Sequence, residues 1–326
     1  MTVLKIGTRD SRLAIARAER VAQGLREVGQ EVELVHVASP PATDSGDRYG
    51  PLPYVQALHT ALSEGTVDVA VQSYKDLPLE NPPRLTTAAI VRREDARDVL
   101  VSRGERALHD LPEGSRVGVS ALRRRGQLAA LGLEVELVSL PGNVDDFEGR
   151  IAQVREGRVE AVVLAQSGMA WLGLTDQISQ HLDPLVMLPA AAQGAIACQC
   201  RANDLDTEHL LRTALHNENT AVAVEAERAA MFRFMDDPVD CAMAPFGALA
   251  SVDTAITLRG VAQDSNGRLV RATVSGAKTE PRAVGHLLAE KLVSRGARRS
   301  TKEFRTLTDS EQVALAIDEG YESWLG

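Results

Sequence analysis

The part of the chain that most constrains the fold is residues 67–78. It begins with an apolar, β-branched run at residues 67–71, which is typical of a buried strand. It continues into Ser73, Lys75 and Asp76, and the proline at its end prevents the strand from extending further. In open α/β sheets, ligands bind outside the carboxyl ends of the strands, so a hydroxyl, an ammonium and a carboxylate are predicted at a ligand-binding edge. A solvated loop with ordinary surface charges is the alternative interpretation of this stretch.

The residues before this strand alternate between strand and helix patterns. Strands are predicted at residues 3–7 and 31–37, with a long amphipathic helix between them. A loop rich in proline, glycine and aspartate at residues 39–53 leads to a helix at residues 54–64. This order predicts an α/β fold.

A second α/β unit is predicted in the middle of the chain, after a dense charge cluster at residues 92–98 that marks a domain crossing. The segment at residues 188–201 is expected to return to the first unit as a strand. Three strands and a helix beyond residue 248 predict a smaller α+β domain. The strands and helices of the second unit are expected at residues 116–120, 121–131, 134–140, 145–156 and 159–165.

Arginines lie at two of the predicted strand-to-helix turns. Arg9 stands among N-cap residue types that include Ser11, so this turn can present free N–H groups to an anion. Arg123, Arg124 and Arg125 follow one another in the first turn of a helix, where they oppose the helix dipole and repel one another. This unfavourable placement indicates a polyanionic ligand, and a solvated basic face is the alternative.

The overall charge requires that any anion be bound locally. The formal net charge of −9 argues against a nucleic acid partner.

We expect a cytoplasmic protein, because no signal peptide or membrane-spanning run is seen and three cysteines are too few for a disulfide framework. Cys198 and Cys200 are expected to be packing thiols rather than metal ligands. Cys241 lies on a predicted loop after three aspartates, which should raise the pKa of its thiol, so the residues alone predict an ordinary thiol.

Seven motifs, taken in order, nevertheless resemble those of the porphobilinogen deaminase (hydroxymethylbilane synthase) family, and they span nearly the whole chain. They are Ile-Gly-Thr-Arg-Asp-Ser-Arg-Leu-Ala at 6–14, Gln-Ser-Tyr-Lys-Asp-Leu-Pro at 72–78, Arg-Arg-Glu-Asp-Ala-Arg-Asp at 92–98, Val-Ser-Ala-Leu-Arg-Arg at 119–124, Gly-Asn-Val at 142–144, Leu-Pro-Ala-Ala-Ala-Gln-Gly-Ala at 188–195 and Ala-Glu-Arg at 226–228.

The resemblance implies three domains. The first two would have the fold of periplasmic binding proteins with a double crossover and an active site in the cleft between them, and the third would be a small α+β domain. We therefore expect domain 1 at residues 1–92 and 193–216, domain 2 at residues 97–188, and domain 3 with a C-terminal tail at residues 217–326. A monomer with a small pyrrole substrate and no metal is expected.

The resemblance also implies a chemistry. Family members deaminate porphobilinogen and join the pyrroles into a linear tetrapyrrole. Asp76 matches the catalytic carboxylate, which stabilises a cationic azafulvene-like species, and Cys241 matches the cysteine that holds a dipyrromethane cofactor through a thioether. The residues that match carboxylate-binding positions are Arg9, Ser11, Lys75, Arg123 and Arg124. The other candidates for the cleft are Ser73, Ser120, Asn143, Phe147, Trp171 and Gln193.

Some positions depart from the family pattern. Pro141, Phe147 and Trp171 stand where the resemblance implies arginines, and Asp145 and Asp146 lie beside them. Each lost charge-assisted hydrogen bond is worth about 1.5–3 kcal/mol. We therefore expect weak tetrapyrrole synthesis and better activity on a smaller or less anionic pyrrole, on which the two aromatic rings would stack.

Three functional readings follow. The chain makes the tetrapyrrole with a rearranged set of cations, or it is a specialised paralogue in a secondary pathway. The third alternative is not an enzyme: a non-catalytic pyrrole- or anion-binding protein would use the same two-domain cleft.

Overall fold

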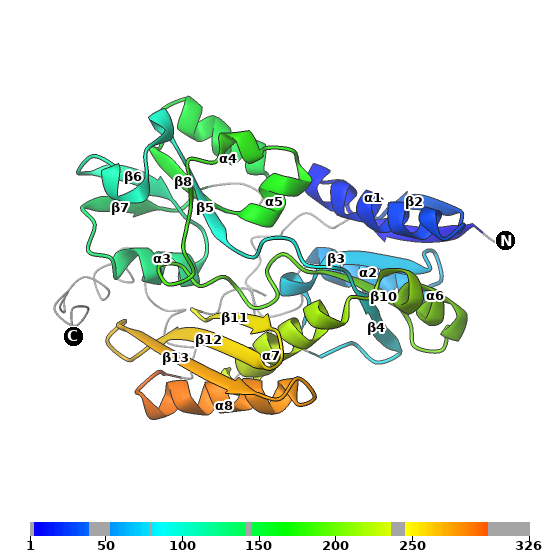
Figure 1. The fold of residues 1–326 in the computed structure, drawn as a ribbon. Coiled ribbons are helices and arrows are strands. Elements are labelled where there is room, and N and C mark those ends of the chain that lie inside the picture. The colour runs from blue at the N-terminus through cyan, green and yellow to red at the C-terminus, as the bar shows by residue number, and fades with distance from the viewer. Residues whose placement is uncertain (1–2, 39–52, 79, 141–144, 236–244, 299–326) are drawn as a thin grey trace. The chain divides into compact units, whose positions relative to one another are not determined.

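The computed structural model describes residues 3–38, 53–78, 80–140, 145–235 and 245–298, which form two compact units (Figure 1). The first unit contains the described residues up to 94 together with 193–222. The second contains residues 95–192 and the described residues from 223 onward. Residues of the predicted second and third domains thus lie in one unit, and the boundary between these two domains stays a prediction.

The first unit is built on a mixed five-stranded sheet with the order β2-β1-β3-β10-β4. β1 pairs in parallel with β2 and β3, whereas β10 is antiparallel to both β3 and β4. Ile196 pairs with Ser73, so the expected return of the later segment into the first sheet is confirmed. The strands are β1 (Leu4–Thr8), β2 (Val32–His36), β3 (Val69–Ser73), β4 (Leu85–Ile90) and β10 (Ile196–Arg201).

Three helices pack against this sheet. Their bounds are α1 (Arg12–Glu27), α2 (Pro53–Ser63) and α6 (Leu205–Leu215). α1 begins where the Ser11 hydroxyl accepts a hydrogen bond from the Ala14 amide, which satisfies a free donor of the first turn. All five residues of β3 are buried, as its apolar run predicts, and the strand leads directly into the short helix η1 (Tyr74–Asp76).

The second unit contains another mixed five-stranded sheet, with the order β7-β6-β8-β5-β9. β6 pairs in parallel with β7 and β8, and β5 is antiparallel to β8 and β9. The strands are β5 (Asp98–Ser102), β6 (Ser115–Gly118), β7 (Val135–Val138), β8 (Ala161–Ala165) and β9 (Gln180–His181). The helices are α3 (Leu122–Ala129), α4 (Phe147–Arg155) and α5 (Gln166–Trp171), with 3-10 turns η2 (Arg103–Glu105), η3 (Leu108–Asp110) and η4 (Thr175–Gln177).

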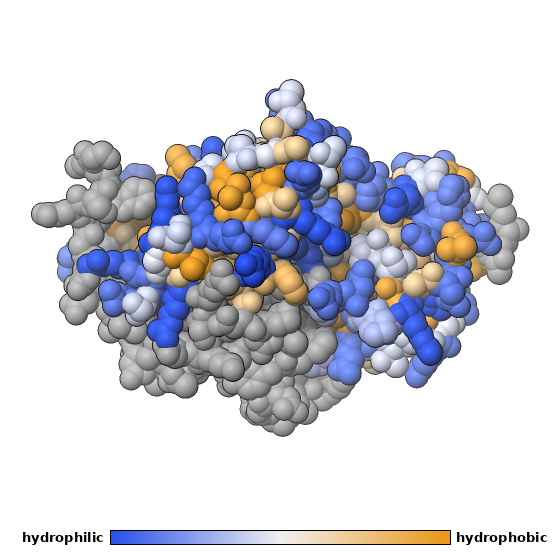
Figure 2. Space-filling model, turned by 90° about the horizontal axis from the view of Figure 1, so that it is seen from below, coloured by the Kyte–Doolittle hydropathy of each residue, from blue (hydrophilic) through white to orange (hydrophobic). Residues whose placement is uncertain are grey.

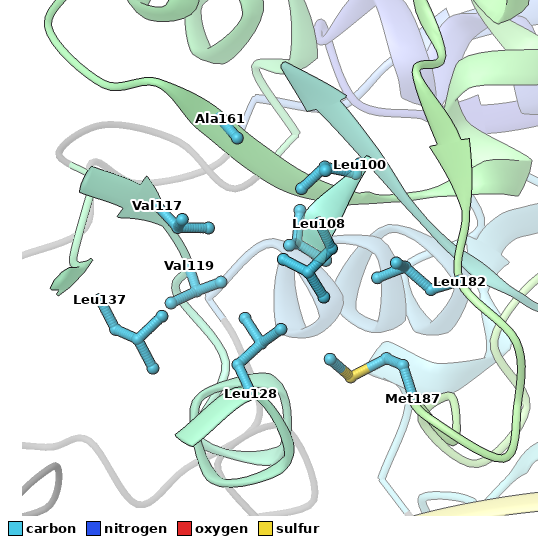
Figure 3. Packing of buried hydrophobic residues seen from close by; sticks show 10 residues of the cluster. Leu100, Leu108, Val117, Val119, Leu128, Leu137, Ala161, Leu182 and Met187 are labelled. Carbon is cyan, nitrogen blue, oxygen red and sulfur yellow. The ribbon is translucent and has the colours of Figure 1, made fainter. Parts of the chain in front are cut away.

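The core of this sheet is a cluster of aliphatic side chains from its strands and from α3. Figure 3 shows Leu128 of α3 directed toward the strands, close to Val119 and Leu108. Leu128 is 1% exposed, so its burial anchors the short helix that carries the arginines. β5 was not predicted from the sequence, because its apolar run of three residues directly follows the charge cluster.

The second unit also contains the predicted small antiparallel sheet, β11-β12-β13, the helix α8 and most of the helix α7, whose residues 218–222 belong to the first unit. α8 packs against β12 and β13 (Figure 1). A Cβ atom added at Gly285 of α8 would lie 2.5 Å from the Ala226 carbonyl oxygen, so glycine allows α8 to approach α7 closely. The elements are α7 (Glu218–Phe234), β11 (Gly247–Val252), β12 (Ile256–Gln263), β13 (Leu269–Gly276) and α8 (Pro281–Ser294).

The surface is mixed in polarity. Figure 2 shows one face, on which hydrophilic side chains surround smaller hydrophobic areas. No helix in the described parts of the chain is both long enough and apolar enough to cross a membrane.

Candidate functional site

The carboxyl end of β3 carries the residues that the sequence singled out. Ser73 is 3% exposed, and Lys75 and Asp76 are half-buried on η1. The Tyr74 amide donates to the Ala195 carbonyl at 3.0 Å, which ties the start of η1 to the segment that returns from the middle of the chain. The hydroxyl, ammonium and carboxylate groups therefore follow a buried strand, as expected, and are not part of a free surface loop.

Arg9 is held close to this region by an aromatic ring. It is 8% exposed, and its guanidinium carbon lies 3.8 Å from the centroid of the Tyr54 ring, which is a cation–π contact. Its Nη2 donates to the Ser11 hydroxyl at 3.4 Å, and that hydroxyl also caps α1. Ser11 thus positions both the helix and the arginine. Tyr54 was not among the predicted site residues.

Arg17 is a further cation that the sequence analysis did not select. It is 5% exposed on the inner face of α1. Burial lowers the pKa of its guanidinium to about 10, the Asp76 carboxylate opposes this shift, and the Arg9 charge adds to it. Burial and then Asp76 raise the pKa of the Tyr54 phenol. We call Arg9, Arg17, Tyr54 and Asp76 the Asp76 cluster, because Asp76 and Arg9 both affect the pKa values of Arg17 and Tyr54.

The second unit holds a different cluster around Asp98, which is completely buried. Its carboxylate forms ion pairs with Arg123 at 2.8 Å and with Arg124 at 2.7 Å. Burial alone would raise the pKa of Asp98, but the two guanidinium groups outweigh it and hold the pKa well below its ordinary value. Arg123 also donates to the Leu188 carbonyl, so its place is fixed by two acceptors.

The three consecutive arginines do not form one basic face. Arg123 and Arg125 are each 5% exposed, which excludes the solvated face that was the alternative. Arg125 instead donates to the Leu137 carbonyl at 3.1 Å. The inference of a ligand from mutual repulsion is therefore weakened for this helix alone, since a buried carboxylate compensates part of the charge.

A neighbouring helix adds another buried cation, Arg150 of α4. Arg150 is 5% exposed, and its Nη1 donates to the Ser120 hydroxyl at 2.7 Å. Its Nε and Nη2 are buried and have no hydrogen-bond partner among the described residues. Burial, and secondarily the charge of Arg124, lower the pKa of this guanidinium, whereas Asp146 opposes the shift. We call Asp98, Ser120, Arg123, Arg124 and Arg150 the Asp98 cluster.

The Asp98 cluster carries an excess of positive charge. It contains three arginines whose side chains are buried or nearly so, and a single buried carboxylate. Buried N–H donors without an acceptor cost free energy, so the cluster is suited to a carboxylate ligand that supplies two oxygens.

Phe147 has a packing role that the sequence analysis did not foresee. It is 7% exposed at the start of α4, and a Cβ atom added at Gly168 of α5 would lie 2.4 Å from its ring. Its neighbour Asp146 caps α4 by accepting from the Gly149 amide at 2.9 Å. Arg150, one turn further along the helix, is the residue that reaches Ser120. The arginine three positions after Phe147 was visible in the sequence, but the position of the helix relative to Ser120 was not.

The remaining predicted residues belong to different units or lie outside the described residues. Trp171 is half-buried at the end of α5, and Gln193 is 1% exposed in the first unit, where its carbonyl accepts from Arg93 Nε at 2.7 Å. Asn143, Pro141 and Cys241 lie outside the described residues.

The two cysteines of β10 are buried and not joined in a disulfide. Burial raises the pKa of Cys198 to about 12 and that of Cys200 to about 11, which agrees with packing thiols. No group of three or more histidine, cysteine or acidic side chains suited to a metal ion occurs in the part of the chain that the structure describes.

Comparison with known proteins identifies the family. A family model described as porphobilinogen deaminase, dipyromethane cofactor binding domain, matches residues 4–209. This chain belongs to the porphobilinogen deaminase family. The predicted family, its transferase class and its dipyrromethane cofactor are thereby confirmed.

Curated porphobilinogen deaminases are similar over most of their length. The protein from Nocardia farcinica is 41% identical over 310 residues, covering 91% of this chain and 87% of the relative. The protein from Mycobacterium leprae is 42% identical over 311 residues, covering 91% and 96% of the two chains. Among solved structures, the methionine binding protein MetQ matches 65% of this chain and 89% of its own, with a TM-score of 0.43 and 16% identity.

Proposed function

We propose that this chain deaminates porphobilinogen and joins the pyrrole units head to tail into a linear tetrapyrrole. The observation that carries the proposal is the Asp98 cluster, a buried, net positive group in a chain that belongs to this family. Porphobilinogen is one pyrrole that bears an acetate and a propionate, so a chain of joined pyrroles is a polyanion. Binding this polyanion requires a cluster of positive charges.

Asp76 is the proposed catalytic carboxylate. Loss of ammonia from the aminomethyl group leaves positive charge on the pyrrole, and a fixed carboxylate stabilises that charge in the transition state. Asp76 is half-buried at the end of a fully buried strand, and such a rigid element holds a charged group in one place. The same carboxylate can accept a proton from the pyrrole nitrogen.

Arg9, Ser11 and Lys75 are proposed to bind ligand carboxylates in the first unit. The guanidinium of Arg9 is already held by Tyr54 and Ser11, so little conformational freedom is lost when it binds an anion.

The residues of the Asp98 cluster fit the dipyrromethane group. That group carries carboxylates, and the buried Nε and Nη2 of Arg150 have no acceptor among the described residues. Arg123, Arg124 and Arg150 would hold it through these carboxylates, with Ser120 fixing Arg150. When bound, the group supplies the pyrrole ring to which further units are joined.

Cys241 is the proposed attachment point. Cys198 and Cys200 are enclosed in β10 with raised thiol pKa values, and the thiolate is the nucleophilic form of cysteine. Of the three cysteines in the chain, these two are therefore poorly suited to form a thioether.

The expectation of weak tetrapyrrole synthesis depended on the absence of cations near Phe147, and two of the residues behind it have structural roles. Phe147 packs α4 against α5 and Asp146 caps α4, so both have structural roles. Arg150, three positions after Phe147, supplies a buried cation on the same helix. We therefore propose porphobilinogen itself as the substrate. The specialised paralogue that uses a less anionic pyrrole is the second candidate, because Trp171 rather than a cation ends α5.

Intact mass spectrometry of the purified protein tests the cofactor assignment. We expect added mass of one dipyrromethane unit, together with a colour reaction with an aldehyde reagent, and both should be absent in Cys241→Ser. Cys198→Ser is the matched control and should keep both. A protein that has only its sequence mass, yet consumes porphobilinogen, would show that this cysteine carries no cofactor.

A further inference from the structure

Gln127 is a buried polar residue on the helix that carries the arginines of the Asp98 cluster. It is 1% exposed in α3, one turn after Arg123. Its amide group pairs with the backbone of Leu188 in both directions: Nε2 donates to the Leu188 carbonyl at 3.0 Å, and Oε1 accepts from the Leu188 amide at 2.9 Å. A buried amide needs such partners, and Gln127 finds them 61 positions away in the sequence.

Leu188 lies in a segment that depends on bonds of this kind. Residues 182–195, all of which the structure describes, form neither helix nor strand. Buried backbone N–H and C=O groups in such a segment must find partners outside a helix or a ladder. Leu188 is 2% exposed, so Gln127 supplies bonds that solvent does not. The Gln127 oxygen also accepts from Arg271 Nη2 of β13 at 3.3 Å, which links α3 to the small antiparallel sheet of the same unit.

The carbonyl of Leu188 is shared between Gln127 and Arg123. It accepts from Arg123 Nη1 at 2.5 Å as well as from the Gln127 amide. The same Nη1 donates to Asp98 Oδ2 at 2.8 Å. Two acceptors therefore hold one nitrogen of Arg123, and Gln127 determines where one of these acceptors lies.

These bonds leave one edge of the Arg123 guanidinium available. Among the described residues, only Nη1 of Arg123 has acceptors. Every nitrogen of the Arg124 guanidinium is engaged, by contrast, with Nε and Nη2 donating to Asp98 and Nη1 to the Val163 carbonyl. The Nε–Nη2 edge of Arg123 can therefore bind a carboxylate through two parallel hydrogen bonds.

We propose that Gln127 is a positioning residue for Arg123, acting through the Leu188 backbone so that the Nε–Nη2 edge stays directed to a ligand carboxylate. This inference rests on the proposed function, in which Arg123 binds a carboxylate of the dipyrromethane group. A glutamine with only a structural role would hold residues 182–195 in place without affecting how Arg123 binds its ligand.

Steady-state kinetics with porphobilinogen and intact mass spectrometry separate these two roles. Gln127→Met keeps the length of the side chain and removes both bonds to Leu188. We expect KM to rise about tenfold or more while kcat changes by less than about threefold, because a binding group is misplaced. The fraction of purified chains that carry the dipyrromethane mass should fall as well.

Gln180→Met is the matched control for this change. The Gln180 oxygen accepts from the Leu108 amide at 2.7 Å in the same unit, so this substitution also removes a bond from a side-chain amide to the backbone. It should lower the melting temperature but leave KM and the loaded fraction unchanged.

Combining variants tests whether Gln127 acts through Arg123. In the Arg123→Met background, Gln127→Met should not raise KM further. Wild-type KM and loading in a folded Gln127→Met protein, or increases in KM that multiply in the double variant, would overturn the inference. If Gln127→Met does not fold, the comparison is made with Gln127→Glu, which keeps an acceptor for the Leu188 amide but, when ionised, has no donor for its carbonyl.

A melting-temperature cycle uses no turnover and so separates failure of this inference from failure of the proposed function. Gln127→Met and Arg123→Met should each lower the melting temperature. The double variant should lower it by less than their sum, because loss of either donor lets the Leu188 carbonyl move away from the other. Additive shifts would overturn the link through Leu188. If a folded wild-type protein does not consume porphobilinogen, the proposed function is wrong, and this cycle alone decides whether Gln127 positions Arg123.

Discussion

Asp98 and Arg123 form an ion pair of 2.8 Å in which the carboxylate is completely buried and the guanidinium side chain is 4% exposed. The partners lie 25 positions apart in the sequence, one at the start of β5 and the other in α3. The pair fixes a cation of the proposed cofactor site to a strand of the sheet.

Removing this carboxylate should destabilise the second unit. Asp98→Asn keeps the shape of the side chain but leaves Arg123 and Arg124 without their counter-charge, so we expect the free energy of unfolding to fall by about 3–5 kcal/mol. Urea unfolding measures the change. Glu156→Gln breaks an exposed ion pair with Arg158 in the same unit and should change stability by less than about 1 kcal/mol. Equal effects of the two substitutions would contradict the role given to Asp98.

Arg150 should show opposite effects on binding and on stability. Arg150→Met removes the buried Nε and Nη2 donors, which have no partner among the described residues, so the melting temperature should stay the same or rise. The cation is lost at the same time, so cofactor retention should fall and KM for porphobilinogen should rise about tenfold or more.

Arg155→Gln is the control for this prediction, because Arg155 lies on the same helix and bonds to Gln177 at its surface. It should alter neither the melting temperature nor cofactor retention. A strongly destabilised Arg150→Met protein with normal KM would show that Arg150 serves the fold and not the ligand.

His59 should make the stability of the first unit depend on pH. It is 8% exposed on α2, its Nε2 lies 3.0 Å from Gln199 Oε1, and burial lowers the pKa of the imidazole. The unfolded chain therefore takes up the proton first as the pH falls. The contribution of neutral His59 to the free energy of unfolding is fully present above the ordinary histidine pKa of about 6.5, and it declines as the pH falls below this value.

Melting temperatures between pH 8 and pH 5 test this pH dependence. His59→Leu should reduce the decline below about pH 6.5. His209→Gln, a substitution at an exposed position of α6, should leave the decline as it is in the wild-type protein. An unchanged profile in His59→Leu would assign the decline to other groups.

Local patterns predicted the elements of the fold, because they depend on neighbouring residues. The apolar run of β3, the capping serine of α1 and the small C-terminal sheet were all visible in the sequence. β5 was missed because its apolar run is only three residues long and lies between the polar residues Asp98 and Ser102. Asp98 itself was assigned to the charge cluster at the predicted domain crossing, since nothing local shows that it pairs with arginines of α3.

The candidate site was predictable where a motif carried it and not where packing decided it. Asp76 and Arg9 were selected by motif, and the structure places both in one unit. Phe147 was assigned to the cleft and Arg150 was overlooked, although both are buried, because the packing of α4 against α5 and its approach to Ser120 depend on residues far away in the sequence. Arg17 was overlooked although it interrupts the apolar face of α1, which is the signal that would have revealed it.

The proposed tetrapyrrole synthesis is tested most directly by incubating the purified protein with porphobilinogen, oxidising the products and measuring uroporphyrin by its absorbance and fluorescence. Asp76→Asn is the matched control, since it keeps the shape of the side chain and removes the catalytic charge. We predict that the wild-type protein forms many molecules of uroporphyrin per chain, and that the control forms fewer by orders of magnitude. A folded wild-type protein that carries its cofactor but forms no uroporphyrin, and instead consumes a less anionic aminomethylpyrrole, would contradict the account and support the specialised paralogue.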